Sequence, residues 1–329
     1  MDILLSEHIE GPAINRLAAK YSVVCESLLW KEPARLRQQI AEARAIIVRN
    51  QTQLTADVLA AAPRLQVIGR NGVGLDNIDL EAANHAGIVV IAPLDANAVS
   101  VAELTFGLLL SLARRIPQAH QSTRSGGWER MRFMGVELDG KTLVVCGFGR
   151  IGRRVAMMAR SFGMRIVVFD PYLPADSTAL KECHATRAND LQASLSQADF
   201  VTVHSPLTPQ TRHLFNEAAF NSMKRGAFLV NTSRGGVLDE AALLGALRGG
   251  HLGGAALDVR EWEPPPSGSR LEELDNVILT PHIAAFTAEA QGRTIEAVAA
   301  DVDAVLSGKS ALNAVNFPQP RRGGPGQGA

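Results

Sequence analysis

The chain is poor in several residue types, and each shortage excludes a class of protein. Three cysteines among 329 residues, Cys25, Cys146 and Cys183, lie far apart, without the spacing of a metal site or a disulfide framework. Lys plus Arg and Asp plus Glu each number 33, so the formal net charge is zero. No basic face for nucleic acid or an acidic membrane is indicated. We therefore expect no metal, no nucleic acid and no membrane among its partners.

Long apolar runs are also missing. The most apolar stretch, residues 104–113, is too short to span a bilayer and is bounded by Glu103 and by Arg114 and Arg115. No basic segment followed by an apolar one opens the chain. With the scattered cysteines, these features favour a cytoplasmic location. The hydrophobic content of 46% is ordinary for a globular protein, and the length predicts two domains.

What the chain does contain is a complete β-α-β unit over residues 142–171. Residues 142–146 have the apolar, β-branched composition of a buried strand, and a Gly-x-Gly-x-x-Gly follows them. Apolar residues at helical spacing then predict a helix that ends at Gly163, and residues 165–169 predict a second strand. Such glycines permit a tight turn, close approach of a pyrophosphate and close helix packing, while the helix N-terminus attracts phosphate.

The same unit predicts NAD as the cofactor. Asp170 follows Gly152 by 18 residues, at the end of the second strand, where its carboxylate can accept both ribose hydroxyls and would repel the extra phosphate of NADP. The surrounding strand, helix and acid make the glycine motif a strong signal. Arg150 equally fits a solvated helix charge. The residues expected to contact the cofactor are Gly147, Phe148, Gly149, Arg150, Ile151, Gly152, Asp170, His204, Thr232 and Asp258.

The rest of the chain alternates short apolar strands with helices, the pattern of parallel sheets covered on both faces. Strands are expected at 3–5, 23–25, 45–48, 66–69 and 88–91, and again at 199–203, 227–231, 254–257 and 277–279. Long helices at 98–116 and 286–306 flank the glycine motif. We predict an α/β protein with two doubly wound parallel-sheet domains. A Rossmann NAD-binding domain (99–283) is inserted into a flavodoxin-like substrate domain (1–98 and 284–317), and a disordered tail follows (318–329).

Two loops of the first domain follow predicted strands and carry polar residues. Arg49 begins one, and Arg70 and Asn71 begin the other. Ligands gather at the carboxyl ends of parallel strands. Neighbouring glycines leave the N–H groups of Val73 and Gly74 available for an anion. These loops are therefore predicted to bind substrate, although a glycine turn that caps the next helix fits the second one as well.

Polar residues also follow consecutive strands of the second domain. A dehydrogenase needs a cation for a carboxylate, a proton donor and acceptor, and a group that tunes the donor. Arg234 offers a bidentate fork, His282 an imidazole that titrates near neutrality, and Glu263 a carboxylate that would stabilise the imidazolium. Each of them alone equally fits a packed or solvated loop position. Their shared location at one sheet edge points to catalysis.

These motifs resemble the D-isomer-specific 2-hydroxyacid dehydrogenase family over nearly the whole chain except the tail. The family's Arg, Glu and His fall on Arg234, Glu263 and His282, and its backbone cradle for a carboxylate on Val73 and Gly74. The motifs that carry the resemblance are Arg70-x-Gly-Val-Gly-x-Asp-Asn-Ile-Asp, Gly147-x-Gly-x-x-Gly with Asp170-Pro171, His204-x-Pro-Leu-Thr, Asn231-x-x-Arg234-Gly-Gly, Leu257-Asp-Val with Glu263-Pro264, and Pro281-His282.

Within the family, residues 128–143 are most similar to members that oxidise 3-phosphoglycerate. In those members, arginines matching Arg49, Arg70 and Arg130 surround the substrate phosphate, which implies a homodimer whose neighbouring subunit supplies Arg130. The segment around Trp128 equally fits a structural plug. Asn71 replaces an expected small residue and would hydrogen-bond the carboxylate or hydroxyl of the substrate.

The resemblance therefore implies NAD-dependent interconversion of a small-molecule D-2-hydroxy acid and its 2-oxo acid, with 3-phosphoglycerate favoured. A glyoxylate or hydroxypyruvate reductase, or a dehydrogenase of another anionic 2-hydroxy acid such as sulfolactate, remains an alternative. From another class, a NAD-sensing, co-repressor-like binding protein has the same fold. The intact set of Arg234, Glu263 and His282 favours the enzyme, because a sensor does not need it.

Overall fold

The computed structural model describes residues 1–268 and 270–321. The chain forms two compact units, one of residues 1–97 with the described residues from Thr287 on, the other of Ala98–Phe286. The predicted domain boundaries lie at 98/99 and 283/284. Of the predicted tail, residues 318–321 are described, and Arg321 N donates to Gly87 O at 3.0 Å. Residues 322–329 lie outside the described residues.

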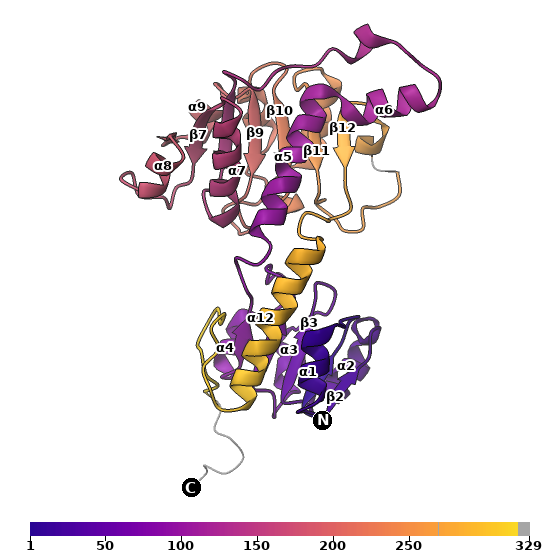
Figure 1. The fold of residues 1–329 in the computed structure, drawn as a ribbon, viewed down its shortest axis with the longest axis vertical. Helices are drawn as coiled ribbons and strands as arrows, with labels where there is room; N and C mark the ends of the chain where they lie inside the picture. Colours follow the sequence, from indigo (N-terminus) through magenta and orange to yellow (C-terminus); the bar gives the residue numbers. More distant parts are fainter. Residues whose placement is uncertain (269, 322–329) are drawn as a thin grey trace. The chain divides into compact units, whose positions relative to one another are not determined.

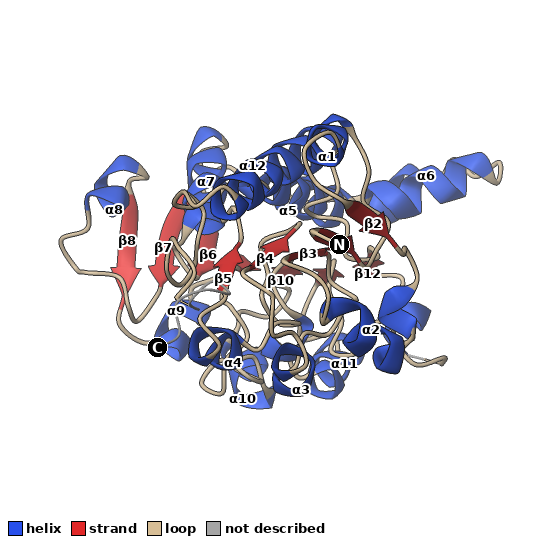
Figure 2. Ribbon diagram, turned by 90° about the horizontal axis from the view of Figure 1, so that it is seen from below, coloured by secondary structure: helices blue, strands red, loops and turns tan. Residues whose placement is uncertain are grey.

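The first unit is a five-stranded parallel sheet in the order β2-β1-β3-β4-β5, which is the flavodoxin-like order. Alternate side chains of each strand enter two separate cores. Ile3 and Leu5 pack with α1 and α12, while Leu4 packs with α2, α3 and α4 on the opposite face (Figure 2). Its elements are β1 (Ile3–Leu5), α1 (Pro12–Ala18), β2 (Val23–Cys25), η1 (Leu29–Lys31), α2 (Pro33–Ile40), β3 (Ala45–Val48), α3 (Ala56–Ala60), β4 (Val67–Arg70), α4 (Leu80–His85), β5 (Val89–Ile91) and α12 (Ala288–Leu306).

The second unit is a seven-stranded parallel sheet in the order β12-β11-β10-β9-β6-β7-β8, the Rossmann order with the strand reversal between β9 and β6. Its two cores again cover both faces, with α5 and α7 on one and α9, α10 and α11 on the other. Its elements up to β9 are α5 (Ala98–Arg114), α6 (Ile116–Arg124), η2 (Arg130–Phe133), β6 (Thr142–Cys146), α7 (Arg150–Ser161), β7 (Arg165–Phe169), α8 (Thr178–Glu182), β8 (Ala185–Ala188), α9 (Leu191–Leu195) and β9 (Phe200–Val203). The remaining elements are α10 (Glu217–Ser222), β10 (Phe228–Asn231), η3 (Gly235–Val237), α11 (Glu240–Arg248), β11 (Gly254–Leu257), η4 (Arg270–Glu273) and β12 (Val277–Leu279).

The predicted fold class is confirmed, and the differences are local. The expected helix 98–116 ends at Arg114, because Arg115 adopts a left-handed conformation (φ 52°) and Pro117 then lies in the first turn of α6. The short helix α8 and the edge strand β8 were not predicted. Thr186 and Arg187 are partly solvated in this strand, so it lacks the apolar run of an inner strand.

Helix α6 and the chain that follows it extend away from the sheet of the second unit (Figure 1). No residue of α6 is buried, and Trp128, Met131 and Met134 expose 79%, 77% and 67% of their surface. We call residues 116–137 the arm. Within the described ranges, no helix has both the length and the apolar character required to cross a bilayer.

Candidate active site

The glycine-rich loop joins β6 to α7 with the geometry of a phosphate cradle. Gly147 has φ +91°, and a Cβ there would lie 2.8 Å from the carbonyl carbon of His204. A Cβ on Gly152 would lie 2.1 Å from Gly147 O, whereas one on Gly149 would meet nothing within 4 Å. Gly149, the N-cap of α7, has no side-chain cap hydrogen bond and leaves space beside the start of the helix, where the helix dipole favours an anion. This arrangement fits a dinucleotide pyrophosphate.

Asp170 lies at the end of β7, beside the glycine loop. Its Oδ2 accepts a hydrogen bond from the N–H of Phe148 at 2.8 Å, and its Oδ1 accepts one from the N–H of Tyr172 at 3.0 Å. The carboxylate is therefore fixed next to the loop that would hold the pyrophosphate. Its contact with the ribose stays a prediction.

His204 follows β9 and packs against the glycine loop. Its N–H donates to Cys146 O at 2.7 Å, but neither ring nitrogen has a hydrogen-bond partner within the described part of the chain, and both are buried. Burial lowers the pKa of His204 to about 3, so the imidazole is neutral at pH 7. Two unpaired ring nitrogens are costly. A bound cofactor could provide the missing hydrogen-bond partners. The contact of His204 with the cofactor stays a prediction.

His282 is held by the turn after β12. Asp258, buried at the end of β11, accepts hydrogen bonds from Thr280 Oγ1 (2.6 Å), Ile283 N (2.9 Å) and Ala284 N (2.8 Å). Its own carbonyl accepts from His282 N at 2.7 Å, and His282 takes a left-handed backbone conformation (φ 54°). The predicted contact of Asp258 with the cofactor stays a prediction. The role of its carboxylate in fixing this turn was missed.

Glu263 contacts His282 directly. Glu263 Oε2 lies 2.6 Å from His282 Nδ1, and Oε1 accepts from Arg260 N at 3.0 Å. Burial acts to raise the pKa of Glu263, but the hydrogen bonds from His282 and the Arg260 N–H, with the positive charges of His282 and Arg234, hold that pKa below its usual value. Glu263 is therefore a carboxylate at neutral pH. Because Nδ1 faces Glu263, Nε2 remains for a substrate.

Arg234 follows β10 on a loop fixed by Asn231. The buried Asn231 amide donates to Arg234 O at 3.0 Å and accepts from the N–H and hydroxyl of Ser233 at 2.9 and 2.8 Å. Arg234 Nη1 donates to Ser233 O at 2.7 Å. β10, β11 and β12 are neighbours in the sheet, so Arg234, Glu263 and His282 follow adjacent strands, and the charge of Arg234 acts on Glu263. Thr232 lies on the same loop, and its buried Oγ1 is hydrogen-bonded to Thr105 Oγ1 at 2.7 Å.

The first unit's loop 70–74 is braced from within. Arg70 is buried, and its Nε donates to Gly74 O at 2.8 Å while Nη1 donates to Asn71 O at 2.9 Å. The guanidinium thus shapes the loop whose N–H groups, on Val73 and Gly74, were predicted to bind a carboxylate. Asn71 is also buried, and for its Oδ1 the described residues provide no hydrogen-bond partner. The predicted substrate contacts of these residues stay predictions.

The neighbouring loop depends on Glu7, which sequence reasoning missed. This buried carboxylate follows β1 and accepts from the N–H groups of Arg49 (2.8 Å), Gln51 (3.2 Å) and Thr52 (3.0 Å). Arg49 Nη2 donates to Gln291 Oε1 at 2.8 Å. An acid directly after the first strand was a usable signal, because it lies at the same sheet edge as the loop after β3.

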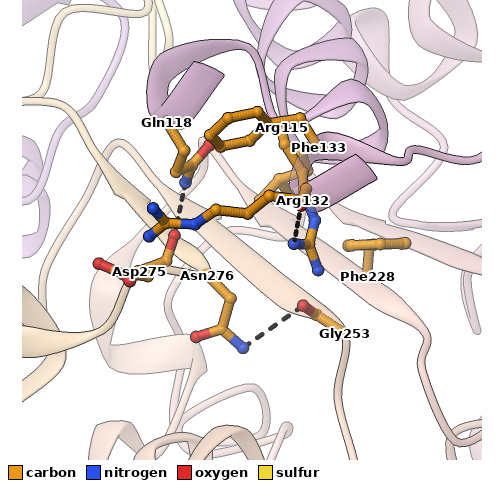
Figure 3. Close-up of a pocket in the computed structure, with 9 residues that line it drawn as sticks. Arg115, Gln118, Arg132, Phe133, Phe228, Gly253, Asp275 and Asn276 are labelled. Atoms are coloured by element: carbon orange, nitrogen blue, oxygen red, sulfur yellow. Dashed lines mark hydrogen bonds between the residues drawn. The ribbon is translucent and has the colours of Figure 1, made fainter. Parts of the chain in front are cut away.

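Figure 3 shows a pocket of the second unit that lies at the opposite end of the strands from Arg234, Glu263 and His282. Gly253 and Asn276 precede β11 and β12, so the pocket lies at the amino ends of strands whose carboxyl ends lead to His282. None of the predicted site residues lines it. Its lining residues are Leu112, Arg115, Gln118, Arg132, Phe133, Phe228, Gly253, Asp275 and Asn276.

The NAD binding domain of the D-isomer specific 2-hydroxyacid dehydrogenases matches residues 106–284. The chain belongs to this family. The predicted family and the predicted cofactor, NAD, are thereby confirmed.

Several relatives are similar over most of the chain. D-3-phosphoglycerate dehydrogenase of Methanocaldococcus jannaschii is 46% identical over 96% of this chain and 59% of that protein. The chain thus spans between half and three-fifths of the length of such curated relatives. A solved Thermus thermophilus structure is 36% identical with a TM-score of 0.89, covering 96% of this chain and 100% of that one. Aquifex aeolicus D-lactate dehydrogenase, solved with NAD and lactic acid, is 31% identical with a TM-score of 0.86, covering 97% and 100%.

Proposed function

We propose that the protein interconverts a D-2-hydroxy acid and the corresponding 2-oxo acid with NAD, and that 3-phosphoglycerate is its substrate. The observation that carries this proposal is the 2.6 Å contact between His282 Nδ1 and Glu263 Oε2, with the charge of Arg234 acting on the same carboxylate. A hydrogen-bonded imidazole and carboxylate beside a guanidinium supply the acid–base pair and the carboxylate anchor that this reaction needs. The relatives named D-3-phosphoglycerate dehydrogenase support the choice of substrate.

In the proposed oxidation, His282 Nε2 takes the proton of the C2 hydroxyl. Glu263, ionised at neutral pH, stabilises the imidazolium that forms. Arg234 and the N–H groups of Val73 and Gly74 hold the carboxylate, so that the C2–H bond faces one direction. The glycine loop and Asp170 would hold NAD, which would supply the hydride acceptor. In reduction His282 returns the proton to the carbonyl oxygen.

The arm belongs to the same proposal. A homodimer in which the arm packs on the second subunit would cover Trp128, Met131 and Met134, which are exposed in one chain. Arg130, also exposed at the start of η2, would then join Arg49 and Arg70 near the substrate phosphate. The first unit would act as the substrate domain and the second as the NAD domain. A cytoplasmic location, favoured by the free cysteines, completes the proposal.

One observation favours a second candidate, a reductase of glyoxylate or hydroxypyruvate or a dehydrogenase of another anionic acid such as sulfolactate. Arg70 is buried and two of its nitrogens already donate to carbonyls of its own loop. Fewer of its N–H groups therefore remain for bidentate hydrogen bonds to a phosphate. This candidate has the same acid–base chemistry, and its substrate differs only in the substituent on C2.

The test is an NADH absorbance assay on a panel of acids. The oxidation arm contains 3-phosphoglycerate, D-glycerate, D-lactate, sulfolactate and malate, and the reduction arm contains hydroxypyruvate and glyoxylate. We expect the highest kcat/KM with 3-phosphoglycerate. A preference for another acid would replace the substrate and keep the mechanism. Tight NADH binding without turnover of any acid would favour the NAD-sensing protein instead.

A further inference from the structure

We propose that the ion pair between Glu240 and Arg260 is a positioning device that sets the orientation of the Glu263 carboxylate. This inference rests on the proposed function, in which Glu263 acts on His282. It adds two residues from α11 and the turn after β11 to the machinery. Neither residue was expected from the sequence to take part in the reaction.

The pair is bidentate and largely shielded from water. Arg260 Nε donates to Glu240 Oε1 at 3.0 Å and Arg260 Nη2 donates to Glu240 Oε2 at 2.9 Å. Arg260 exposes 9% of its surface. Burial acts to lower the pKa of Arg260, but the hydrogen bonds and charge of Glu240, with Glu272 at 3.6 Å, raise it above its usual value. The guanidinium therefore stays charged, and its geometry is fixed by planar, two-point contact.

Glu240 also holds the backbone of the turn. Its Oε1 accepts from the N–H of Glu261 at 2.7 Å in addition to Arg260 Nε. Within the same turn, Arg260 N donates to Glu263 Oε1 at 3.0 Å, which leaves Glu263 Oε2 to face His282. The chain of contacts thus runs from Glu240 through Arg260 to Oε1 of the Glu263 carboxylate, whose other oxygen meets the imidazole.

The turn is also tied to the loop that carries Arg234. A Cβ on Gly235 would lie 1.9 Å from the carbonyl carbon of Arg260, so the two backbones are in direct contact. On the other side, His213 Nε2 lies 2.7 Å from Glu261 Oε1, while His213 N donates to Gly236 O at 2.9 Å. A shift of the turn would therefore move Glu263 relative to both His282 and Arg234. A displacement of about 1 Å can lower the rate of a catalytic step by about 10²-fold.

The test replaces Glu240 by Gln, which keeps the shape and one acceptor oxygen but removes the charge opposite Arg260. The matched control is Glu272→Gln, which removes a carboxylate from the same guanidinium without touching the turn backbone. We expect kcat with the favoured acid to fall about 10-fold in Glu240→Gln. In oxidation, the acid limb of the kcat/KM pH profile should move to lower pH, because a displaced Glu263 holds the proton on His282 less firmly. Glu272→Gln should leave both unchanged.

Two further variants separate the possible failures. Glu263→Gln should shift the acid limb to lower pH by more than Glu240→Gln does. Combining Glu240→Gln with Glu263→Gln should shift it little further. An unchanged profile in Glu263→Gln would overturn the proposed function itself. The positioning role alone would be overturned if Glu263→Gln shifts the pH profile but folded Glu240→Gln has the wild-type profile. This holds whatever the melting temperature of Glu240→Gln. If Glu240→Gln does not fold, Arg260→Lys, which keeps the charge but loses the two-point contact, serves as the same test.

Discussion

The loops at the strand ends of the two units use their polar side chains in opposite ways. In the second unit, supporting residues such as Asp258 and Asn231 are buried and hydrogen-bonded, and they leave His282 and Glu263 partly exposed. In the first unit, a residue expected to bind substrate, Arg70, is itself the buried support. A motif at a strand end therefore does not by itself distinguish a side chain that binds a ligand from one that supports the loop.

This difference has a physical origin. A carboxylate such as Asp258 can accept several N–H groups at once and so fix a tight turn without a counter-ion. A guanidinium has five donors and no acceptor, so Arg70 can brace a loop only by turning toward its carbonyls. In the proposed function, the first unit would therefore offer backbone N–H groups to the substrate carboxylate, and the second unit would offer the side chains of Arg234 and His282.

The largest effect is expected when the exposed pair of the second unit, His282 and Glu263, is broken. Replacing His282 by Ala removes the group that carries the proton, and we expect kcat to fall by about 10²–10⁴-fold. NADH affinity, measured by fluorescence titration, should stay within about a factor of three. Turnover within a few-fold of the wild type would show that another residue moves the proton.

The next effect tests whether the buried support is as important as the exposed pair. Asp258→Asn places an amide against the N–H groups of Ile283 and Ala284, so at least one donor loses its partner. We expect unfolding free energy to fall by about 1–3 kcal/mol and kcat to fall roughly 10²-fold. Urea unfolding and steady-state kinetics measure the two. Lost stability with wild-type kcat in the folded fraction would limit Asp258 to a structural role.

The sequence predicted the fold well because the signals were local. Buried strands such as Thr142–Cys146 are continuous apolar runs, and the glycine motif marks the switch from strand to helix. The edge strand β8 was not predicted, because it contains partly exposed residues such as Arg187 and therefore lacks an apolar run. The left-handed Arg115 that divides α5 from α6 has no signal beyond Pro117 two residues later.

The candidate site was predictable for residues that follow strands and unpredictable for the residues that support them. His282, Glu263 and Arg234 lie at one sheet edge, as the parallel pattern implied. Glu7 and Glu240 support loops that are distant in sequence. Their partners include backbone N–H groups, which every residue except proline carries and which therefore give no sequence signal. Such pairings depend on the folded geometry and leave no spacing rule in the chain.

A smaller effect sharpens the contrast between supporting and binding arginines. Arg70→Ala leaves the carbonyls of Asn71 and Gly74 without their donor, so we expect unfolding free energy to fall by about 1–3 kcal/mol. Arg130→Ala, at an exposed position, should leave stability unchanged and raise the KM for 3-phosphoglycerate about 10-fold, with no change for D-lactate. Equal losses of stability in both variants would contradict the contrast.

The smallest effect concerns His204, the strand-end residue of the second unit whose ring nitrogens lack partners within the described part of the chain. Its pKa is about 3 when folded, against an ordinary value of 6.5, so between these values the unfolded chain binds more protons than the folded one. Stability contributed by neutral His204 is complete above pH 6.5 and is lost as the pH falls below it. In His204→Phe, urea midpoints should therefore decline less between pH 7.5 and about 5.5 than in the wild type. His120→Gln, at an exposed histidine, is the control and should decline like the wild type, and parallel declines in all three proteins would show that His204 is not held neutral by burial.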